Sequence, residues 1–401
     1  MIKREIYLKS LRPLYNETSL IKILYGLRRS GKSVLLTQII EEIVELGVKE
    51  DHIIYINFES LEFVNIKTAV DLDKYIKDRT LKSGTYYLFL DEIQNVDEFE
   101  KALNSLRITN KYSIFVTGSN SKMTFSELST DLSGRYLSFR VNPLCFKEVV
   151  EITGSKKEDY KKTLLDMFEW GGLPQRFSFQ DENTKKNYIS DIYDSIILKD
   201  VIDRIGINDI TGFNKIFQYI LEIEGKELSP TNILNYLEHE HKKISSETLY
   251  NYIDALCSTF IINRVYRYDV HGKNVLKTLN KFYVTDLGIK KIKSNEKEDN
   301  YSRSLENIVY NDLIIKGYEV YIGKTSKGEI DFIAVKNKTV NYVQVCYSLN
   351  DESTRKREFN AFDSINDNYP KYVISLDEVD YSMNGIKHLN AIDFLLSDGL
   401  K

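Results

Sequence analysis

The sequence has few cysteines and prolines and no long apolar run. Its 401 residues include 3 Cys, 5 Pro and 1 Trp. Cys145, Cys257 and Cys346 are odd in number, far apart and without a C-x-x-C pair, which argues against a disulfide framework and a cysteine zinc site. No segment approaches the roughly 18 apolar residues of a membrane helix, and residues 1–16 lack the apolar core of a signal peptide. We therefore expect a reduced, cytoplasmic protein with no membrane part.

The sequence also lacks a strong net charge. Lys and Arg number 55 and Asp and Glu number 59, so the formal net charge is −4. This balance argues against a uniformly basic nucleic-acid coat and leaves only a local basic patch as an option. With 42% hydrophobic residues the chain can bury a core, and at roughly 100 to 200 residues per domain we expect two or three domains.

The strongest motif is a glycine-rich loop, GLRRSGKS at residues 26–33, which fits the Walker A pattern G-x-x-x-x-G-K-[ST] without mismatch. Residues 21–25 form an apolar strand pattern before it, and residues 34–44 follow with apolar side chains at helical spacing. Glycines let backbone N–H groups turn around phosphates, and the start of the next helix adds positive potential. The residues predicted to bind nucleotide are Gly26, Leu27, Arg28, Arg29, Ser30, Gly31, Lys32, Ser33 and Val34.

Within this loop two side chains have specific predicted roles. Lys32 is expected to reach the β and γ phosphates, where it acts in catalysis as well as in binding. The Ser33 hydroxyl is expected to bind Mg²⁺. The alternative is a glycine-rich turn that arises by chance, which the strand and helix patterns on either side argue against.

A second apolar strand pattern, residues 86–90, ends in two acids. Carboxyl ends of parallel strands face a ligand, so we expect Asp91 to hold Mg²⁺, directly or through water. Glu92 is expected to polarise the attacking water, which makes it the catalytic base. A solvated strand end is the alternative, and it is less consistent with a phosphate loop upstream.

A third strand pattern, residues 112–117, runs into small polar side chains. Its end is predicted to lie beside the γ-phosphate. We take Ser119 as the sensor of that phosphate, with Thr117 and Asn120 as alternatives. Residues 51–58 show a further buried-strand pattern, which adds a member to the sheet.

These motifs resemble those of the AAA-type P-loop ATPases of prokaryotes, which carry a GxRRxGKS loop, an LDEIQ segment and a TGSN segment. Here the segments are residues 26–33, 90–94 and 117–120, followed by LSGR at 132–135 and NPL at 142–144. The match is dense over about the first 150 residues and looser beyond them. The resemblance implies ATP as the nucleotide. It also implies a parallel sheet in the order 5-1-4-3-2, with one strand between the phosphate-loop strand and the carboxylate strand.

The resemblance also assigns roles to arginines. It implies that Arg135 is an arginine finger that completes charge neutralisation, in a neighbouring subunit of a homo-oligomer. The alternative is a structural arginine at the surface. A helical lid is implied after the ATPase core, and Arg176 would act from it as a second phosphate sensor. Arg28 and Arg29 either touch nucleotide or are solvated or paired with acids.

Residues 226–295 show the element order of a winged helix. Helix starts at Ser229-Pro230 and at residues 244–248 are followed by strand patterns at residues 261–268 and 281–285. Residues 242–291 hold nine Lys and Arg against four Asp and Glu, a local excess of positive charge.

This basic window has two interpretations. One is a module that binds duplex DNA through phosphates, with Ser246, Tyr250 and Asn251 near bases or sugars. The other is a winged helix that docks a protein partner and whose charges are only solvated. The sequence does not separate them.

The last hundred residues are predicted as an αβββαβ unit: a helix at 305–313, strands at 318–322, 329–335 and 340–347, a helix at 353–365 and a strand at 372–375. This order is similar to the restriction-endonuclease-like fold, whose active members use a helix Glu, a strand Asp and [Glu or Gln]-x-Lys. The resemblance carries over to Glu306, Asp331 and Gln344, but Cys346 stands where the lysine belongs. A thiol does not balance developing charge as an ammonium does, and a neutral amide attracts Mg²⁺ less than a carboxylate. We therefore expect an α/β nuclease-like domain without a complete nuclease site.

The sequence thus predicts four parts: an ATPase core at 1–150, a helical lid at 151–225, a winged helix at 226–295 and a nuclease-like domain at 296–401. The preferred function is a Mg²⁺-dependent ATPase whose nucleotide state moves the C-terminal modules. One alternative is a machine that uses ATP turnover to remodel DNA. Another is an interaction switch with slow hydrolysis, a protein partner and no nucleic-acid role. A small-molecule kinase is less consistent, because the Asp91-Glu92 pair fits water activation better.

Overall fold

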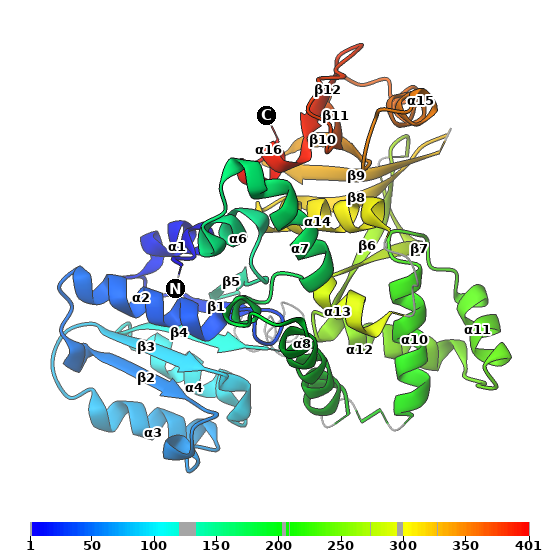
Figure 1. The fold of residues 1–401 in the computed structure, drawn as a ribbon. Helices are drawn as coiled ribbons and strands as arrows, with labels where there is room; N and C mark the ends of the chain where they lie inside the picture. Colours follow the sequence, from blue (N-terminus) through cyan, green and yellow to red (C-terminus); the bar gives the residue numbers. More distant parts are fainter. Residues whose placement is uncertain are drawn as a thin grey trace. The chain divides into compact units, whose positions relative to one another are not determined.

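The computed structural model describes residues 2–119, 134–202, 206–207, 209–272, 274–294, 300–326 and 328–400. The chain divides into two compact units, Met1–Asn142 and Pro143–Lys401, and each is described by itself (Figure 1). None of the helices in the described ranges is long and apolar enough to cross a membrane.

The first unit is built on a five-stranded sheet in the order β2-β3-β4-β1-β5. All of its neighbouring strands are parallel. Read from the β5 edge, the order is 5-1-4-3-2, and β4 lies between β1 and β3, which confirms the predicted topology. The strands are β1 (Ile21–Tyr25), β2 (Ile53–Asn57), β3 (Tyr86–Asp91), β4 (Tyr112–Gly118) and β5 (Tyr136–Arg140).

Helices cover both faces of this sheet, because alternate side chains of a buried parallel strand point to opposite faces and both are apolar. Leu24 and Phe89 belong to the core cluster under α1 and α2, whereas Ile23 and Leu88 belong to the cluster under α3 and α4 (Figure 1). The helices and 3₁₀ turns are α1 (Glu5–Leu11), η1 (Arg12–Leu14), α2 (Lys32–Glu45), η2 (Glu50–His52), η3 (Leu61–Phe63), α3 (Ala69–Arg79), η4 (Ile93–Asn95) and α4 (Phe99–Ile108). The result is a three-layer α/β unit.

The second unit begins with helices. Within residues 151–225, α7 (Tyr160–Trp170) ends at Gly171. The predicted helix starts are confirmed: the side chains of Ser229 and Ser245 accept from the backbone N–H groups three residues on, and so cap α11 and α12. The other helical elements are α6 (Phe146–Thr153), η6 (Lys157–Asp159), η7 (Pro174–Ser178), α8 (Glu182–Ile196), the π-helical η8 (Ile197–Ile202), α10 (Ile210–Glu222), α11 (Pro230–His239), α12 (Ser246–Ser258), α13 (Leu287–Lys293), α14 (Tyr301–Ile315), α15 (Glu352–Asn360) and α16 (Ala391–Leu396).

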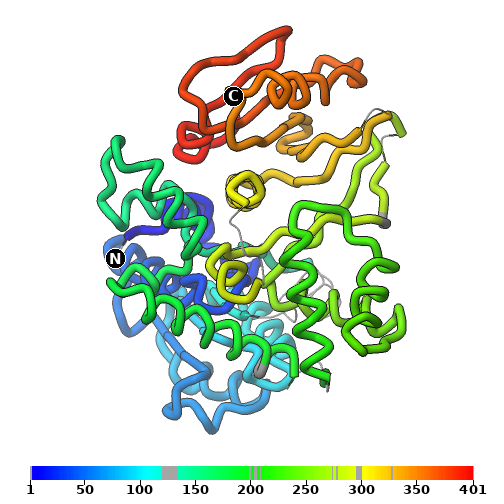
Figure 2. Tube along the Cα trace, turned by 45° about the vertical axis from the view of Figure 1, so that its right-hand side comes forward, coloured from blue at the N-terminus to red at the C-terminus, as the bar shows by residue number. Residues whose placement is uncertain are grey.

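A seven-stranded mixed sheet completes the second unit, in the order β12-β11-β10-β9-β8-β6-β7. The strand patterns at residues 261–268 and 281–285 correspond to β6 and β7, which form a hairpin, and β6 pairs in parallel with β8 (Figure 2). Strands from both sides of the predicted boundary at residue 295 therefore share one sheet. The strands are β6 (Ile262–Asp269), β7 (Asn274–Val284), β8 (Glu319–Lys324), β9 (Glu329–Lys336), β10 (Thr339–Val345), β11 (Lys371–Ser375) and β12 (Ile386–Asn390). The predicted αβββαβ elements are α14, β8, β9, β10, α15 and β11, and β12 and α16 follow them.

Candidate functional site

The glycine-rich loop connects β1 to α2 at the carboxyl edge of the parallel sheet. Gly26 has φ 141°, and a Cβ placed there would lie 2.3 Å from the carbonyl oxygen of Val141, so only glycine fits. Arg29 and Gly31 also have positive φ, at 63° and 99°. Left-handed residues interspersed with right-handed ones form concave arrangements of backbone N–H groups, which favour an anion. Gly31 is also the N-cap of α2, whose N-terminal end has a positive potential.

Lys32 is folded into this loop. Its side chain is nearly buried, and Nζ donates to the carbonyl oxygens of Gly26 and Leu27 at 3.1 Å each. Phosphate oxygens are stronger partners for an ammonium than neutral carbonyls, so an anion in the loop would compete for this group. Ser33, the next residue, is exposed at the start of α2, whereas Ser30 is fully buried.

An N-terminal arginine that the sequence analysis did not identify supports the loop from behind. Arg4 is almost fully buried, and its guanidinium donates to the carbonyl oxygens of Ser30 and Asn142 at 3.0 Å each. Its backbone N–H donates to Gln38 Oε1 on α2, and Gln38 Nε2 donates to the carbonyl of Ile2. Arg4 therefore fixes the loop backbone to α2 and to the segment after β5. No pattern in the sequence marks it.

Asp91 lies at the end of β3, as predicted, and its side chain is fully buried. Its Oδ2 accepts from the hydroxyl of Tyr55, 3.1 Å away on the neighbouring strand β2, and its Oδ1 accepts from the hydroxyl of Thr117 on β4. Burial and the Asp91 charge raise the pKa of Tyr55 to about 12, so the tyrosine stays a donor. The two hydroxyls hold the carboxylate at the edge where the phosphate loop begins.

Glu92 follows in a left-handed conformation, φ 56°. Its backbone N–H donates to Thr117 Oγ1 at 2.9 Å, so one hydroxyl fixes both acids. Ser119 Oγ donates to Glu92 Oε2 at 3.0 Å, and Gln94 Nε2 donates to the same oxygen. The structure thus brings together Asp91, Glu92, Thr117 and Ser119, whereas Asn120 lies outside the described residues. Gln94, part of the LDEIQ segment, was not identified as a site residue.

The predicted arginines lie at different places. Arg28 forms an ion pair with Glu59 at 2.8 Å, and Arg29 is exposed. Arg135 is exposed at the amino end of β5, where its carbonyl accepts from Ile21 N. It is one strand length, about 15 Å, from the end of the sheet at which its own phosphate loop lies. A catalytic role for Arg135 therefore requires a second copy and stays a prediction.

Two further arginines, Arg176 and Arg140, have different surroundings. Arg176 is 1% exposed, pairs with Asp166 at 2.8 Å and lies over the ring of Phe177 within the second unit. Burial lowers the pKa of its guanidinium, and Asp166 opposes that shift. These contacts describe an anchor inside the helices, and phosphate sensing by Arg176 stays a prediction. Arg140, at the carboxyl end of β5, lies opposite Tyr25 in the register of β1 and β5 and so beside the start of the loop. It was not identified from the sequence.

In the second unit, most cations of the basic window are paired with acids. In the part of residues 242–291 that the structure describes, six Lys and Arg side chains form ion pairs: Lys242 with Asp209, Lys243 with Glu238, Arg264 with Asp254, Arg267 with Glu227, Lys281 with Glu329 and Lys290 with Glu224. Only Asp254 of these acids lies inside the window. Carboxylates from elsewhere in the chain therefore offset the local positive charge. The Lys290–Glu224 pair is buried, whereas Lys243 is largely exposed.

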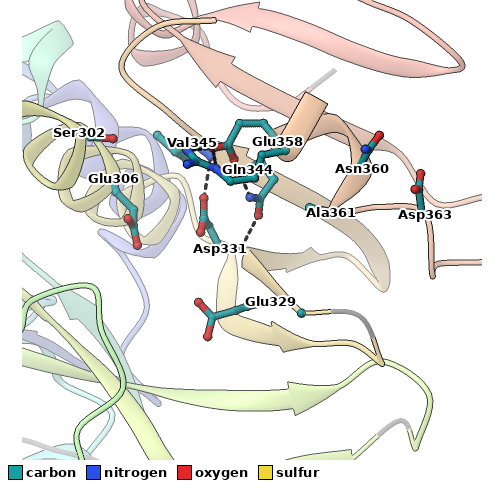
Figure 3. A pocket seen from close by; sticks show the side chains of 12 residues that line it. Ser302, Glu306, Glu329, Asp331, Gln344, Val345, Glu358, Asn360, Ala361 and Asp363 are labelled. Atoms are coloured by element: carbon teal, nitrogen blue, oxygen red, sulfur yellow. Dashed lines mark hydrogen bonds and ion pairs between the residues drawn. The ribbon is translucent and has the colours of Figure 1, made fainter. Parts of the chain in front are cut away.

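The carried-over nuclease-like residues meet around one cavity of about 610 Å³ in the second unit (Figure 3). Glu306, Asp331 and Gln344 all line it, together with Glu329 and Glu358. Gln344 Oε1 accepts from Asp331 N at 2.7 Å, and its Nε2 donates to Glu358 Oε2 at 2.8 Å. The structure therefore brings together the three residues that the resemblance selected.

The charges around this cavity differ from a complete nuclease site. Burial raises the pKa of Asp331 well above its ordinary value, and the Glu306 carboxylate adds to the shift. Burial also raises the pKa of the Cys346 thiol, so this side chain offers neither an ammonium nor a thiolate. Lys281 on β7 is the cation paired with Glu329, and no sequence pattern placed it here. Within the described ranges, no three His, Cys, Asp or Glu side chains are arranged to hold a metal ion.

Comparison with known proteins matches both the loop and the middle of the chain. A family model described as an AAA domain matches residues 18–150, and one described as a domain of unknown function (DUF8612) matches residues 161–299. An uncharacterized protein of Haemophilus influenzae is 35% identical over 403 residues, 99% of each chain. The uncharacterized protein MJ1544 of Methanocaldococcus jannaschii is 30% identical over 387 residues, 93% of this chain and 85% of that one.

A solved structure, the Walker-type ATPase PABY2304 of Pyrococcus abyssi, aligns with a TM-score of 0.43 and 16% identity over 73% of this chain and 96% of that chain. The identity with the two full-length relatives is high enough, over enough of each chain, to establish common membership of a family. The match at residues 18–150 coincides with the glycine-rich loop, the strand-end acids and the parallel sheet described above. The chain therefore belongs to one family with these uncharacterized proteins of Haemophilus influenzae and Methanocaldococcus jannaschii, and its residues 18–150 match the AAA domain.

Proposed function

We propose that the protein is a Mg²⁺-dependent ATPase that hydrolyses ATP to ADP and phosphate. The observation that carries this proposal is the nearly buried Lys32 ammonium, folded into a glycine loop at the sheet edge where Asp91 ends β3 and Glu92 follows it. The residues fit Mg·ATP, because a loop with left-handed residues before a helix favours an anion, and hydroxyl and carboxylate oxygens are the ligands Mg²⁺ prefers. When bound, Mg²⁺ would neutralise charge on the phosphate oxygens.

The residues of the proposed site then have the following roles. Lys32 and the loop N–H groups would bind phosphate, and Ser33 and Asp91 would hold Mg²⁺. Ser119 would donate to the terminal phosphate. Glu92 would accept a proton from the attacking water. An arginine from a second copy, Arg135, would complete the charge neutralisation in a homo-oligomer.

Steady-state phosphate release tests this proposal. We expect Mg²⁺-dependent turnover in the wild type and none in Lys32→Ala, which loses affinity for ATP. Glu92→Gln is expected to bind ATP with near-normal affinity and to lose turnover. Lys49→Ala, which changes an exposed lysine of the same unit, is the matched control and retains full activity. Unchanged turnover in both Lys32→Ala and Glu92→Gln would rule out the proposed site.

For the C-terminal modules we propose an interaction switch, in which nucleotide state changes what the second unit binds. The observation that favours a protein partner over DNA is the set of six ion pairs in the basic window. Side chains paired in this way are less available to DNA phosphates, although exposed pairs such as Lys243–Glu238 are weak. Duplex binding measured across a salt series separates the two, since phosphate contacts weaken as salt rises. Salt-dependent binding lost on substitution of Lys242 and Lys243 would favour a DNA-binding winged helix instead.

We further propose that the restriction-endonuclease-like domain does not cleave DNA. Cys346 supports this, since a neutral thiol stands where active members of that fold carry an ammonium. Gln344 is also neutral, so it adds no charge to a cavity lined by Glu306, Glu329, Asp331 and Glu358. Incubation of supercoiled DNA with Mg²⁺ and the full chain is expected to leave it intact. Cleavage that Asp331→Asn abolishes would contradict this expectation.

A further inference from the structure

Gln94 lies in η4, after Glu92, and contacts two residues of the candidate site. Its Nε2 donates to Glu92 Oε2 and to Ser119 Oγ, the latter at 3.5 Å. Ser119 Oγ donates to the same Glu92 Oε2 at 3.0 Å. The three side chains therefore form a closed ring in which the carboxylate only accepts and the Gln94 amide nitrogen only donates.

The orientation of the Gln94 amide follows from charge. The reverse orientation would place the amide oxygen against the carboxylate and remove both donations. In the observed orientation Gln94 Oε1 is buried and has no hydrogen-bond partner among the described residues. A buried polar atom without a partner is unfavourable, and donation to a charged acceptor is the contact that offsets it. The contact with Glu92 therefore sets the orientation of the Gln94 side chain.

The two donors to Glu92 are not equivalent. A hydroxyl has one hydrogen, so Ser119 donates either to Glu92 or to another acceptor such as a terminal phosphate oxygen. The amide of Gln94 has two hydrogens and can keep one on Glu92 in either case. Both donations converge on Oε2, which leaves Oε1 as the Glu92 oxygen to accept from water.

We propose that Gln94 is a positioning residue for Glu92, which keeps the carboxylate directed toward the end of β4 when the Ser119 hydroxyl donates elsewhere. The proposal rests on the ATPase function proposed above. It adds a residue outside the phosphate loop and the acid pair to those that hydrolysis requires. Gln94 acts through Glu92 and does not itself contact nucleotide.

Kinetics give the first readout. Gln94→Met keeps the length of the side chain and removes the donor, so kcat is expected to fall on the order of tenfold, the loss of one hydrogen bond to a charged group. The KM for ATP is expected to stay unchanged, because Lys32 and the loop are untouched. Gln180→Met, at an exposed glutamine, is the matched control. If Gln94→Met does not fold, Gln94→Asn retains an amide, draws the donor back by one carbon and carries the same expectation.

A second readout needs no nucleotide. The urea midpoint of the nucleotide-free protein is measured for Gln94→Met in the wild-type background and in the Glu92→Ala background. We expect the substitution to lower the midpoint more in the wild type, because the carboxylate that Gln94 contacts is missing in the other background. Equal shifts in both backgrounds would overturn the proposed contact.

The outcomes separate this inference from the ATPase proposal. A wild type with no Lys32-dependent turnover contradicts the ATPase function, and the urea experiment still tests the contact. A wild type with Lys32-dependent turnover and a Gln94→Met variant of unchanged kcat overturns the positioning role alone. A rise in KM with unchanged kcat would also overturn it, since it would place Gln94 in substrate binding.

Discussion

The hydroxyl of Thr117 forms hydrogen bonds with both acids of the site. Its substitution by valine tests whether this hydroxyl orders the two acids. The side chain is fully buried, its Oγ1 accepts from Glu92 N at 2.9 Å, and it donates to Asp91 Oδ1. Valine has nearly the same shape without the hydroxyl, so Thr117→Val leaves one N–H and one carboxylate oxygen without this partner.

The cost follows from the two groups left without Thr117. A buried donor or acceptor without a partner costs about 1–3 kcal/mol, and Asp91 keeps Tyr55 on its other oxygen. We therefore expect Thr117→Val to lower the free energy of unfolding by about 2–6 kcal/mol, one such cost for each of the two groups. Thr117→Ser retains the hydroxyl and is expected to lose less than about 1.5 kcal/mol, mainly from the missing methyl group.

Urea unfolding followed by circular dichroism measures both variants. Thr37→Val, at an exposed threonine of α2, is the matched control and is expected to change the free energy of unfolding by no more than about 0.5 kcal/mol. We also expect Thr117→Val to lose turnover and Thr117→Ser to retain it. Equal stability and activity of the valine and serine variants would refute the idea that this hydroxyl orders the acids.

Three further changes test other parts of the first unit. Gly26→Ala would place a Cβ 2.3 Å from the Val141 carbonyl, so we expect loss of ATP binding in calorimetry, and normal affinity would contradict the predicted clash. Arg12 lowers the pKa of Glu42 to about 2. The stability that Glu42 adds relative to Glu42→Gln should therefore be full above pH 4.5 and disappear as the pH falls toward 2. Urea midpoints of the two proteins whose difference does not change with pH would contradict this expectation. Burial lowers the pKa of Lys22 to about 7. The stability of the wild type relative to Lys22→Met should therefore rise from pH 7 to 10, by at most about 1.4 kcal/mol per pH unit. A stability difference that stays constant over this pH range would show that the folded protein keeps the ammonium charged.

Local patterns in the sequence predicted the elements that carry the phosphate loop. The strand at residues 21–25 is β1 as predicted, and Asp91 ends β3 with Glu92 directly after it. Short apolar runs bounded by turn residues predict such strands from local sequence alone. The strand order followed from the family resemblance and not from periodicity. The ring of Gln94, Glu92 and Ser119 was not predicted, since it depends on the side-chain positions at the ends of two strands.

Contacts between segments that are far apart in the sequence were not predicted. The parallel pairing of β6 with β8 depends on register across the sheet, which no local pattern encodes. The charge excess at residues 242–291 was visible, but its partners, such as Glu224 for Lys290, lie far away in the sequence. The strand β12, IKHLN, has a weak apolar pattern and was not predicted. Burial and pairing decide these features, and both come from the whole fold.

Titration of Mg·ATP into the folded chain by calorimetry shows whether the glycine-rich loop binds nucleotide. We expect saturable heat for the wild type, similar affinity for Glu92→Gln, and no binding for Lys32→Ala. A wild-type protein that is folded by circular dichroism and releases no heat with Mg·ATP would contradict this expectation.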